Sequence, residues 1–382
     1  MSGAPADFIA AQATGETWQQ AIGRLLPVLQ KASPEHRLGL IYLTPEFASE
    51  LPDIEVLLRQ STGVPHWAGT VSFGTIGVAR DGALEECYGS PAISVLLCPF
   101  PEEAFRIFSG ARGESDRISE THSDWLSQAG PPMILAHGDT GNGLLGSIID
   151  DIVEETDGFM IGGLSAAQGP GSQIADGADG QGLSGVLLSL AQLPVQTALS
   201  QGCSPIGPVH TVTAGEENVI FELNGRKALD VFKEDIGEIL ARDLNRCAGY
   251  IFAALPVAGS DSGDYTVRNL MAIDPRHGAI AIAASVRPGD GVMFCRRDPA
   301  SAADDMRRML SDIKRRLGDR PIRGGLYVSC AARGPNQFSD PARETQLIEE
   351  ALGRFPLTGF FANGEFSRDR LYSYTGVLTL FI

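Results

Sequence analysis

The sequence contains no pair of cysteines in a CxxC motif and no pair of histidines in an HxH or HxxxH motif. Its six cysteines stand far apart, at positions 87, 98, 203, 247, 295 and 330. Zinc-binding domains and disulfide-stabilised secreted domains carry paired cysteines, so neither class is indicated. We therefore expect reduced thiols that mostly lie buried in the core.

Positive charge is also scarce, because 30 Lys and Arg residues stand against 47 Asp and Glu residues, which gives a net charge of −17. Such a charge argues against nucleic acids and anionic membranes as partners. No apolar run approaches the roughly 18 residues that a membrane-spanning helix needs. The first residues lack the basic start and apolar centre of a signal peptide, so we expect a cytoplasmic protein.

The patterning of the chain predicts an α+β fold. Apolar residues recur at helical spacing over 16–31, and a buried strand is expected over 38–43. Later strands are separated by short Gly/Pro turns, which favours antiparallel pairing. A length of 382 residues makes two domains the default expectation. We predict two mixed modules, 1–200 and 201–382, with largely antiparallel sheets flanked by helices, and we find no sequence repeat between the two halves.

Three local interpretations accompany this fold. Residues 66–79 are expected to form one strand, and 183–190 and 194–199 to form a hairpin. The glycine-rich, polar stretch 166–182 is expected to be an exposed, mobile loop.

The carboxyl-terminal stretch combines two strand-like runs, Gly359–Ala362 and Leu371–Phe381. Asn363 and Gly364 lie between them and tolerate positive φ, so the stretch predicts a β-hairpin. A chain that stops on an apolar strand must bury that strand, which indicates an interior position in a sheet. Glu365 directly follows the turn, and its carboxylate is a candidate for ligand recognition.

Two motifs suggest chemistry but are weak. The sequence from Gly141 to Gly146 matches GxGxxG, a pattern that in dinucleotide-binding proteins directs backbone N–H groups at phosphates. The match is short, the loop has no lysine, and no acidic strand end follows, so we interpret it as a structural turn. Cys330 would need a nearby base to act as a nucleophile, and no histidine is close in sequence. A cysteine hydrolase is therefore not indicated.

A buried strand over 322–330 delivers Ser329, Cys330 and Arg333 to its carboxyl end. An arginine among small side chains is suited to bind a carboxylate in bidentate fashion. The structural alternative is a salt bridge to Glu365 or to another acid inside the fold.

Two further places in the second half carry candidate residues. Arg268 and Asn269 lie within an apolar strand, where a charge must be paired or must face a cavity. Cys203 lies in a Gly- and Pro-rich corner over 201–208 and is expected to pack there.

Long stretches of the second half resemble the carboxyl-terminal module of the FIST family, a name that stands for F-box and intracellular signal transduction. They are QGCSPIGPVHTVT, NVIFELNGRKALDVF, VRNLMAIDPRHGAIAIA, GGLYVSCAARG and GFFANGEFSRDRLYSYTGVLTLF. In the first half, GTVSFGTIGVARDGALEECYGSPAISVLLCPFP and GFMIGGLSAAQG resemble the amino-terminal module more loosely. The resemblance extends over about 38–382. The positions that match the motifs are Gln201, Gly202, Cys203, Pro205, Gly207, Arg268, Asn269, Cys330, Arg333, Gly359, Phe360, Gly364 and Glu365.

The resemblance implies a ligand sensor and not an enzyme. We expect a stand-alone sensor that binds a small molecule, such as an amino acid, and passes the signal to a separate partner of the kinase or cyclase type. Some relatives are haem proteins that sense nitric oxide through a histidine. Haem is therefore an alternative here, with His66, His137, His210 and His277 as candidate ligands. A ligand-free interaction module is the third possibility.

The resulting hypothesis is a pocket where the two modules meet. Arg333 would bind a carboxylate and Glu365 an amine, which together suit a zwitterion. The other expected ligand-binding residues are Ser329, Cys330, Asn363, Arg268, Asn269 and Cys203.

Overall fold

The computed structural model describes residues 6–111, 113, 117–167, 172–179, 182–257, 265–338, 340 and 342–382. Contacts divide the chain into two compact units. The first unit consists of Met1–Ser200, Met306–Leu371 and Thr375–Ile382, and the second of Gln201–Asp305 and Tyr372–Tyr374. The chain therefore leaves the first unit at residue 200 and returns to it after residue 305. These compact units differ from the two modules expected from the sequence, 1–200 and 201–382, because most of the residues after 305 belong to the first unit.

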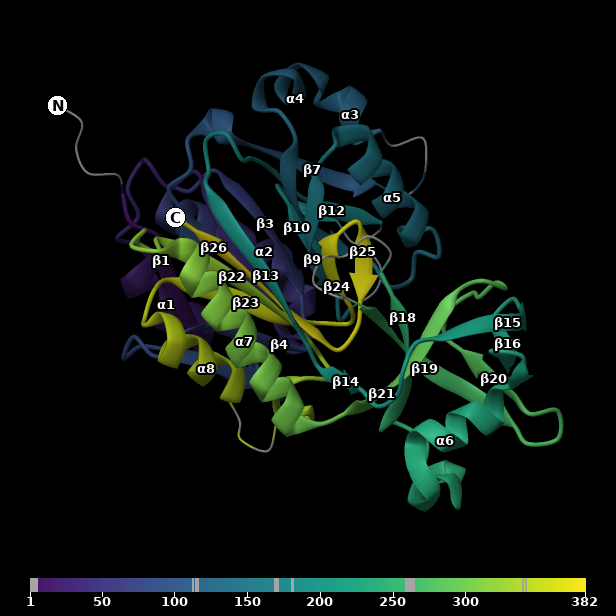
Figure 1. Ribbon diagram of the computed structural model, residues 1–382. Coiled ribbons are helices and arrows are strands. Elements are labelled where there is room, and N and C mark those ends of the chain that lie inside the picture. Colours follow the sequence, from purple (N-terminus) through teal and green to yellow (C-terminus); the bar gives the residue numbers. More distant parts are fainter. Residues whose placement is uncertain are drawn as a thin grey trace. The chain divides into compact units, whose positions relative to one another are not determined.

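Within the described residues, the first unit contains three six-stranded sheets, and its helices lie outside them (Figure 1). Each sheet has a parallel pair of strands at its centre, β2 and β3, β8 and β9, or β22 and β23. All the other pairs whose register is known are antiparallel. The predicted α+β fold is confirmed.

The same order of elements occurs three times along the first unit. Each repeat runs strand, helix, strand, helix, parallel strand, two-stranded hairpin and returning strand. The first repeat consists of β1 (Ile9–Thr14), α1 (Trp18–Leu29), β2 (Leu38–Leu43), α2 (Leu51–Thr62), β3 (His66–Val71), β4 (Gly74–Val78), β5 (Leu84–Tyr88) and β6 (Ala92–Cys98). The second consists of β7 (Phe105–Ala111), the short helices α3 (Ile118–Thr121) and α4 (Ser123–Ala129), β8 (Pro132–Gly138), α5 (Leu145–Thr156), β9 (Phe159–Leu164), β10 (Gln173–Ala175), β11 (Ala178–Asp179) and β12 (Leu183–Ser189). The third consists of β13 (Val195–Gln201), α7 (Pro299–Leu317), β22 (Gly324–Cys330), α8 (Arg343–Leu352), β23 (Leu357–Ala362), β24 (Glu365–Arg368), β25 (Arg370–Tyr372) and β26 (Thr375–Phe381).

The hairpin of each repeat extends the sheet of a different repeat. The first hairpin, β4 and β5, joins the third sheet beside β23, whereas β10 and β11 join the first sheet beside β3. The third hairpin, β24 and β25, joins the second sheet beside β9. The exchange is cyclic, so no repeat can complete its own sheet without another. The main segment of the second unit interrupts the third repeat, from the last residue of β13 to the first turns of α7.

The three sheets enclose a shared apolar core, to which β2, β8 and β22 contribute alternate residues. Their inward side chains include Leu40, Leu135 and Val328. On the outer faces, α1 and α2 cover the first sheet and α5 covers the second. Side chains of α8 contact β22 on the outer face of the third sheet.

The second unit is built around a closed antiparallel barrel. Its strands pair in the circular order β21, β15, β16, β20, β19, β18 and back to β21. The bounds are β14 (Cys203–Pro205), β15 (His210–Glu216), β16 (Val219–Leu223), β17 (Arg226–Lys227), α6 (Ala228–Ala241), β18 (Ile251–Pro256), β19 (Tyr265–Asp274), β20 (Ala279–Ile282) and β21 (Gly291–Arg297). Phe232 of α6 packs on Phe294 of β21 in the core of this barrel.

Four local expectations need correction. The terminal strands β23 and β26 do not form a hairpin, because they lie on opposite sides of β22. The strands β12 and β13 do not pair, since β12 lies between β7 and β8 while β13 pairs with β26. Residues 66–79 form two strands that enter different sheets. In the glycine-rich stretch, Gln173–Ala175 is a buried strand, while 168–171 and 180–181 lie outside the described residues.

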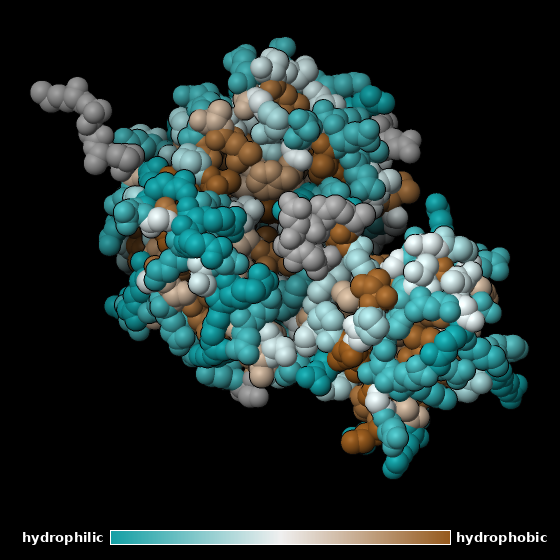
Figure 2. All heavy atoms as spheres, viewed as in Figure 1, coloured by the Kyte–Doolittle hydropathy of each residue, from teal (hydrophilic) through white to brown (hydrophobic). Residues whose placement is uncertain are grey.

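The expectation that the last strand is interior is confirmed, because β26 has β13 on one side and β22 on the other. Within the part of the chain that the structure describes, no helix is long and apolar enough to cross a membrane. Hydrophilic side chains cover most of the face seen in Figure 2.

Candidate functional site

The carboxyl end of β22 brings together four of the predicted residues. Ser329 and Cys330 end the strand, Arg333 follows in the next turn, and Glu365 begins β24. All four are buried, and Ser329, Arg333 and Glu365 have no exposed surface. Asn363 is exposed, and its backbone N–H donates to the Leu164 carbonyl.

Arg333 has an internal acidic partner, but this partner is Glu344 of α8 and not Glu365. The Arg333 Nε donates to Glu344 Oε1 over 2.8 Å. The same carboxylate accepts hydrogen bonds from the Tyr327 hydroxyl (2.6 Å), the Ser329 hydroxyl (2.9 Å) and the backbone N–H of Gly334 (3.0 Å). Burial by itself lowers the pKa of Arg333, but the negative charge of Glu344 more than offsets this, and the pKa is raised. The guanidinium is therefore charged.

Glu365 is held by a different set of groups. Its Oε2 accepts from the backbone N–H and the hydroxyl of Thr375, over 3.1 and 2.8 Å. Burial raises the pKa of Glu365 to about 8, although hydrogen bonds from Thr375 and Cys330 and the charge of Arg333 oppose the shift. The carboxyl group is therefore mostly protonated at neutral pH.

Arg333 and Glu365 each keep one atom free of protein partners. Among the described residues, Arg333 Nη1 and Glu365 Oε1 are buried and have no hydrogen-bond partner. The charge of Arg333 acts on Glu365, yet the only ion pair that Arg333 makes within the described chain is with Glu344. The region thus offers one buried guanidinium donor and one buried carboxyl oxygen.

A second acid lies beside Glu344. Glu86 of β5 accepts from the backbone N–H of Thr345 (2.9 Å), and its Oε2 has no partner within the described residues. Burial, followed by the negative charge of Glu344, raises the pKa of Glu86 to about 8. Perturbed acids in one region are typical of functional sites.

Sequence reasoning did not select Glu344, Glu86 or Thr375. A signal for Glu344 exists, because Leu347 and Ile348 follow it at spacings of three and four and all three residues are buried. Neither Glu86 nor Thr375 carries a comparable signal.

Equivalent inward positions of the other two sheets carry Tyr42 and His137. Tyr42, His137 and Cys330 each follow an inward core residue, Leu40, Leu135 or Val328, at a spacing of two in β2, β8 and β22. The Tyr42 hydroxyl lies 3.3 Å from His137 Nε2, while His137 Nδ1 is buried without a partner in the described chain. Burial lowers the pKa of His137 to about 3, so its ring is neutral.

The remaining haem candidates are engaged or exposed. The two ring nitrogens of His66 contact Asp176 (2.7 Å) and Glu102 (2.9 Å). Those of His210 contact Asp235 and Asn224, over 2.7 and 3.0 Å. His277 is exposed and contacts Asp274. No cluster of three His, Cys, Asp or Glu residues suited to a metal ion occurs in the described residues.

The structure groups the other predicted residues in the second unit. Cys203 is buried beside Cys295, and their hydrogen bond, together with burial, raises the pKa of the Cys295 thiol. Asn269 accepts from the Tyr374 hydroxyl over 2.9 Å. Arg268 donates to the carbonyl of Val267, and burial lowers its pKa.

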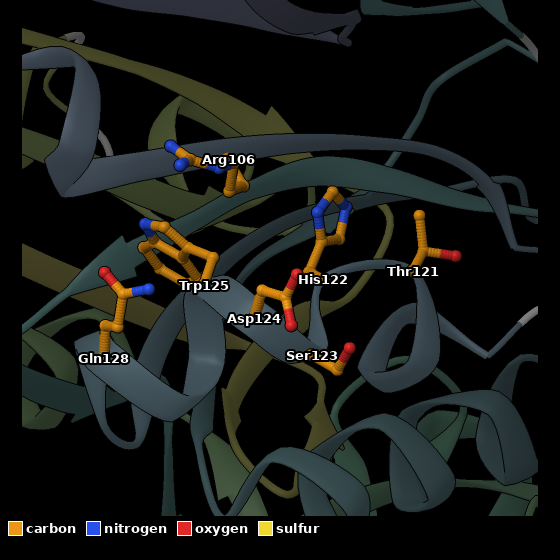
Figure 3. A pocket seen from close by; sticks show the side chains of 7 residues that line it. All are labelled: Arg106, Thr121, His122, Ser123, Asp124, Trp125 and Gln128. Carbon is orange, nitrogen blue, oxygen red and sulfur yellow. The ribbon is translucent and has the colours of Figure 1, made fainter.

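An open hollow of about 240 Å³ in the first unit combines both signs of charge. It is lined by Arg106, Thr121, His122, Ser123, Asp124, Trp125 and Gln128 (Figure 3). The Arg106 guanidinium lies over the Trp125 ring, 5.5 Å from its centre. Burial and the charge of Arg106 lower the pKa of His122. This hollow therefore offers a zwitterion both a cationic side chain, Arg106, and an acidic one, Asp124.

Comparison with known proteins identifies two adjoining domains. The FIST N domain matches residues 37–226, and the FIST C domain matches residues 228–368. The chain is similar to Uncharacterized protein Rv0628c of Mycobacterium tuberculosis, with 35% identity over 197 residues, which cover 49% of this chain and 50% of that protein. It is likewise 35% identical to Uncharacterized protein Mb0898c of Mycobacterium bovis over 193 residues, which cover 48% of this chain and 50% of the relative. The chain thus spans about half the length of these curated relatives.

Proposed function

The chain belongs to the FIST family, whose domains act in signal transduction, and we propose that it is a small-molecule sensor whose ligand is bound by Arg333 and Glu365. The proposal assigns it a zwitterionic ligand, with amino acids as the first class. A separate signalling protein, of the kinase or cyclase type, would receive the signal.

One observation supports this proposal above the others: Arg333 Nη1 and Glu365 Oε1 are both buried and both lack a protein partner in the described chain. Native proteins satisfy nearly all their buried polar groups. An unsatisfied buried donor or acceptor costs about 1–3 kcal/mol, which a ligand recovers when it supplies the missing partner. A carboxylate suits the guanidinium donor, and an ammonium group suits the carboxyl oxygen.

Burial of both atoms also suggests how binding becomes a signal. A ligand reaches them only if the chain around the end of β22 opens locally. Such opening is a conformational change that a ligand stabilises through its greater affinity for the open form. The proposed output of the sensor is this rearrangement.

A thermal-shift screen with the common amino acids, and with their decarboxylated and deaminated analogues, tests the assignment. A ligand at 100 times its Kd adds about 2.7 kcal/mol to the free energy of unfolding. We expect a zwitterion to raise the Tm more than an analogue that lacks either charged group. Glu365→Gln keeps the size of the side chain and an oxygen for Thr375, but it can no longer present a carboxylate to an ammonium group, so the shift should be lost.

Arg106→Ala is the matched control, because it removes an arginine from the hollow of about 240 Å³ that is lined by both a cationic and an acidic side chain. If the rise in Tm persisted in Glu365→Gln and disappeared in Arg106→Ala, the ligand would be bound in that hollow and not at Arg333 and Glu365. If no zwitterion raises the Tm of the unaltered protein, the ligand class is wrong, and a ligand-free interaction module becomes the better hypothesis.

A further inference from the structure

We infer that the ends of α7 and α8 form a second binding site, for an anionic amphiphile such as a medium-chain carboxylate. The site is a hollow of about 290 Å³, which we call the basic hollow. Its residues are Lys314, Leu317, Gly318, Arg320, Ile322, Leu352, Arg354 and Phe355. All of them belong to the first unit, and none of them takes part in the proposed sensor site.

The basic hollow has three cationic residues and no acidic residue in its lining. This composition is unusual in a chain whose net charge is −17. Arg354 is paired with Glu349, whereas Lys314 and Arg320 make no ion pair within the described residues. Like charges that face one hollow repel each other, and a bound anion relieves this repulsion.

The heads of two cations are held in place by helix ends. Lys314 Nζ donates to the Ala351 carbonyl in the last turn of α8, over 2.7 Å. The Arg320 guanidinium donates to the carbonyls of Leu317 (3.1 Å) and Arg316 (2.7 Å) at the end of α7. An ammonium group has three donors and a guanidinium five, so both cations retain donors for a ligand. Their positions are fixed before an anion arrives, which favours binding.

The remaining lining is apolar. Leu317 and Phe355 are almost fully buried, and Ile322 and Leu352 are half-buried. A small inorganic anion has no apolar surface to bury against these side chains, whereas an aliphatic tail does. The combination of a cationic rim and an apolar lining therefore selects a carboxylate with a hydrocarbon chain.

Calorimetric titration of the full-length chain with sodium octanoate, below its micelle concentration, tests this inference. We expect octanoate to bind at least tenfold more tightly than acetate, which lacks the tail, and than octylammonium, which carries the opposite charge. Lys314→Gln/Arg320→Gln removes both charges and leaves a polar N–H donor on each side chain, and the Kd for octanoate should rise at least tenfold.

The control Arg308→Gln/Arg315→Gln removes two charges from the same helix, at residues that face Asp312 and lie outside the hollow. It should leave the Kd within twofold of the original value. Equal affinity for octanoate and octylammonium, or an unchanged Kd in Lys314→Gln/Arg320→Gln, would overturn the site. So would binding to phosphatidylglycerol vesicles without any binding of monomeric octanoate, because the ligand would then be a membrane surface.

Discussion

Arg333 and Glu344 form an ion pair in which Nε and Oε1 are 2.8 Å apart and neither side chain has any exposed surface. Transfer of two charges from water to a protein interior is unfavourable unless each finds hydrogen bonds there. Glu344 accepts hydrogen bonds from three further donors, Tyr327, Ser329 and Gly334. Glu344 therefore connects α8 to both the end of β22 and the turn that follows it.

Removal of one partner of this pair should be strongly destabilising. Glu344→Gln keeps the shape of the side chain but leaves the Arg333 charge buried without compensation. We expect the free energy of unfolding to fall by about 3–5 kcal/mol, measured by urea denaturation followed by circular dichroism. Arg315→Ala breaks an exposed pair with Asp312 and should change stability by less than about 1 kcal/mol. A loss of similar size in both variants would contradict the role given to the buried pair.

The pH dependence of stability should identify Glu365. Its pKa is about 8 in the folded chain, against 4.5 for an unperturbed glutamate, so between these values the folded state holds a proton that the unfolded state has lost. Stability contributed by this group is complete below about pH 4.5 and is lost as the pH rises through 8. One proton corresponds to a slope of at most about 1.4 kcal/mol per pH unit.

The comparison is best made between pH 6.5 and 8. His137 has a depressed pKa of about 3 against 6.5 in the unfolded chain, so below pH 6.5 it makes stability rise with pH and opposes Glu365. Above pH 6.5 this histidine is mostly neutral in both states. We expect the stability of the unaltered protein to fall more steeply with pH than that of Glu365→Gln in this window. If the two proteins gave parallel curves of stability against pH, Glu365 would not retain its proton in the folded chain. The pKa of Glu86 is also raised, but Glu86 is present in both proteins, so its contribution cancels in the comparison.

Close packing of the central strands predicts opposite effects for two glycine substitutions. A Cβ at Gly162, where φ is 119°, would lie 2.0 Å from the Ala136 carbonyl oxygen of the neighbouring strand. Glycines of the other two parallel pairs, Gly69 and Gly359, are as close to their neighbours, at 1.8 and 1.9 Å. Gly162→Ala should therefore lower the free energy of unfolding by at least about 2 kcal/mol.

Gly146→Ala is the matched control within the same repeat. Gly146 lies in α5, and a Cβ there meets no atom within 4 Å. Alanine restricts the unfolded chain more than glycine does, so this variant should gain about 0.4–1 kcal/mol. If both substitutions changed the stability equally in thermal denaturation, the backbone around Gly162 would accommodate the added Cβ without a loss of free energy of unfolding.

Local patterns predicted the elements well and their partners poorly. The strand over Leu38–Leu43 has the expected bounds, and the helix expected over 16–31 is observed at Trp18–Leu29, because apolar runs and helical spacing are local properties. The turn at Asn363 and Gly364 also exists, but it directs the chain into another sheet. The sheet that each hairpin joins is set by the cyclic exchange among the three repeats. The repeats share their order of elements, and this order does not show which sheet each hairpin joins. The expected strand over 322–330 carries Ser329 and Cys330 at its end and Arg333 just beyond it, whereas Glu344 as the partner of Arg333 depends on how α8 packs on β22, which no local pattern determines.

The proposed ligand chemistry predicts that binding releases a proton. Glu365 is mostly protonated at pH 7, because burial raises its pKa to about 8. An ammonium group beside it stabilises the carboxylate and lowers this pKa, so the complex should lose up to one proton per ligand. The ligand found in the thermal-shift screen should therefore give different calorimetric binding enthalpies at pH 7 in phosphate and Tris buffers, which differ in their enthalpies of ionisation. In Glu365→Gln any residual binding should show no dependence on the buffer. Uptake of a proton by the unaltered protein would mean that the ligand presents an anion to Glu365, and the orientation of the zwitterion would have to be reversed.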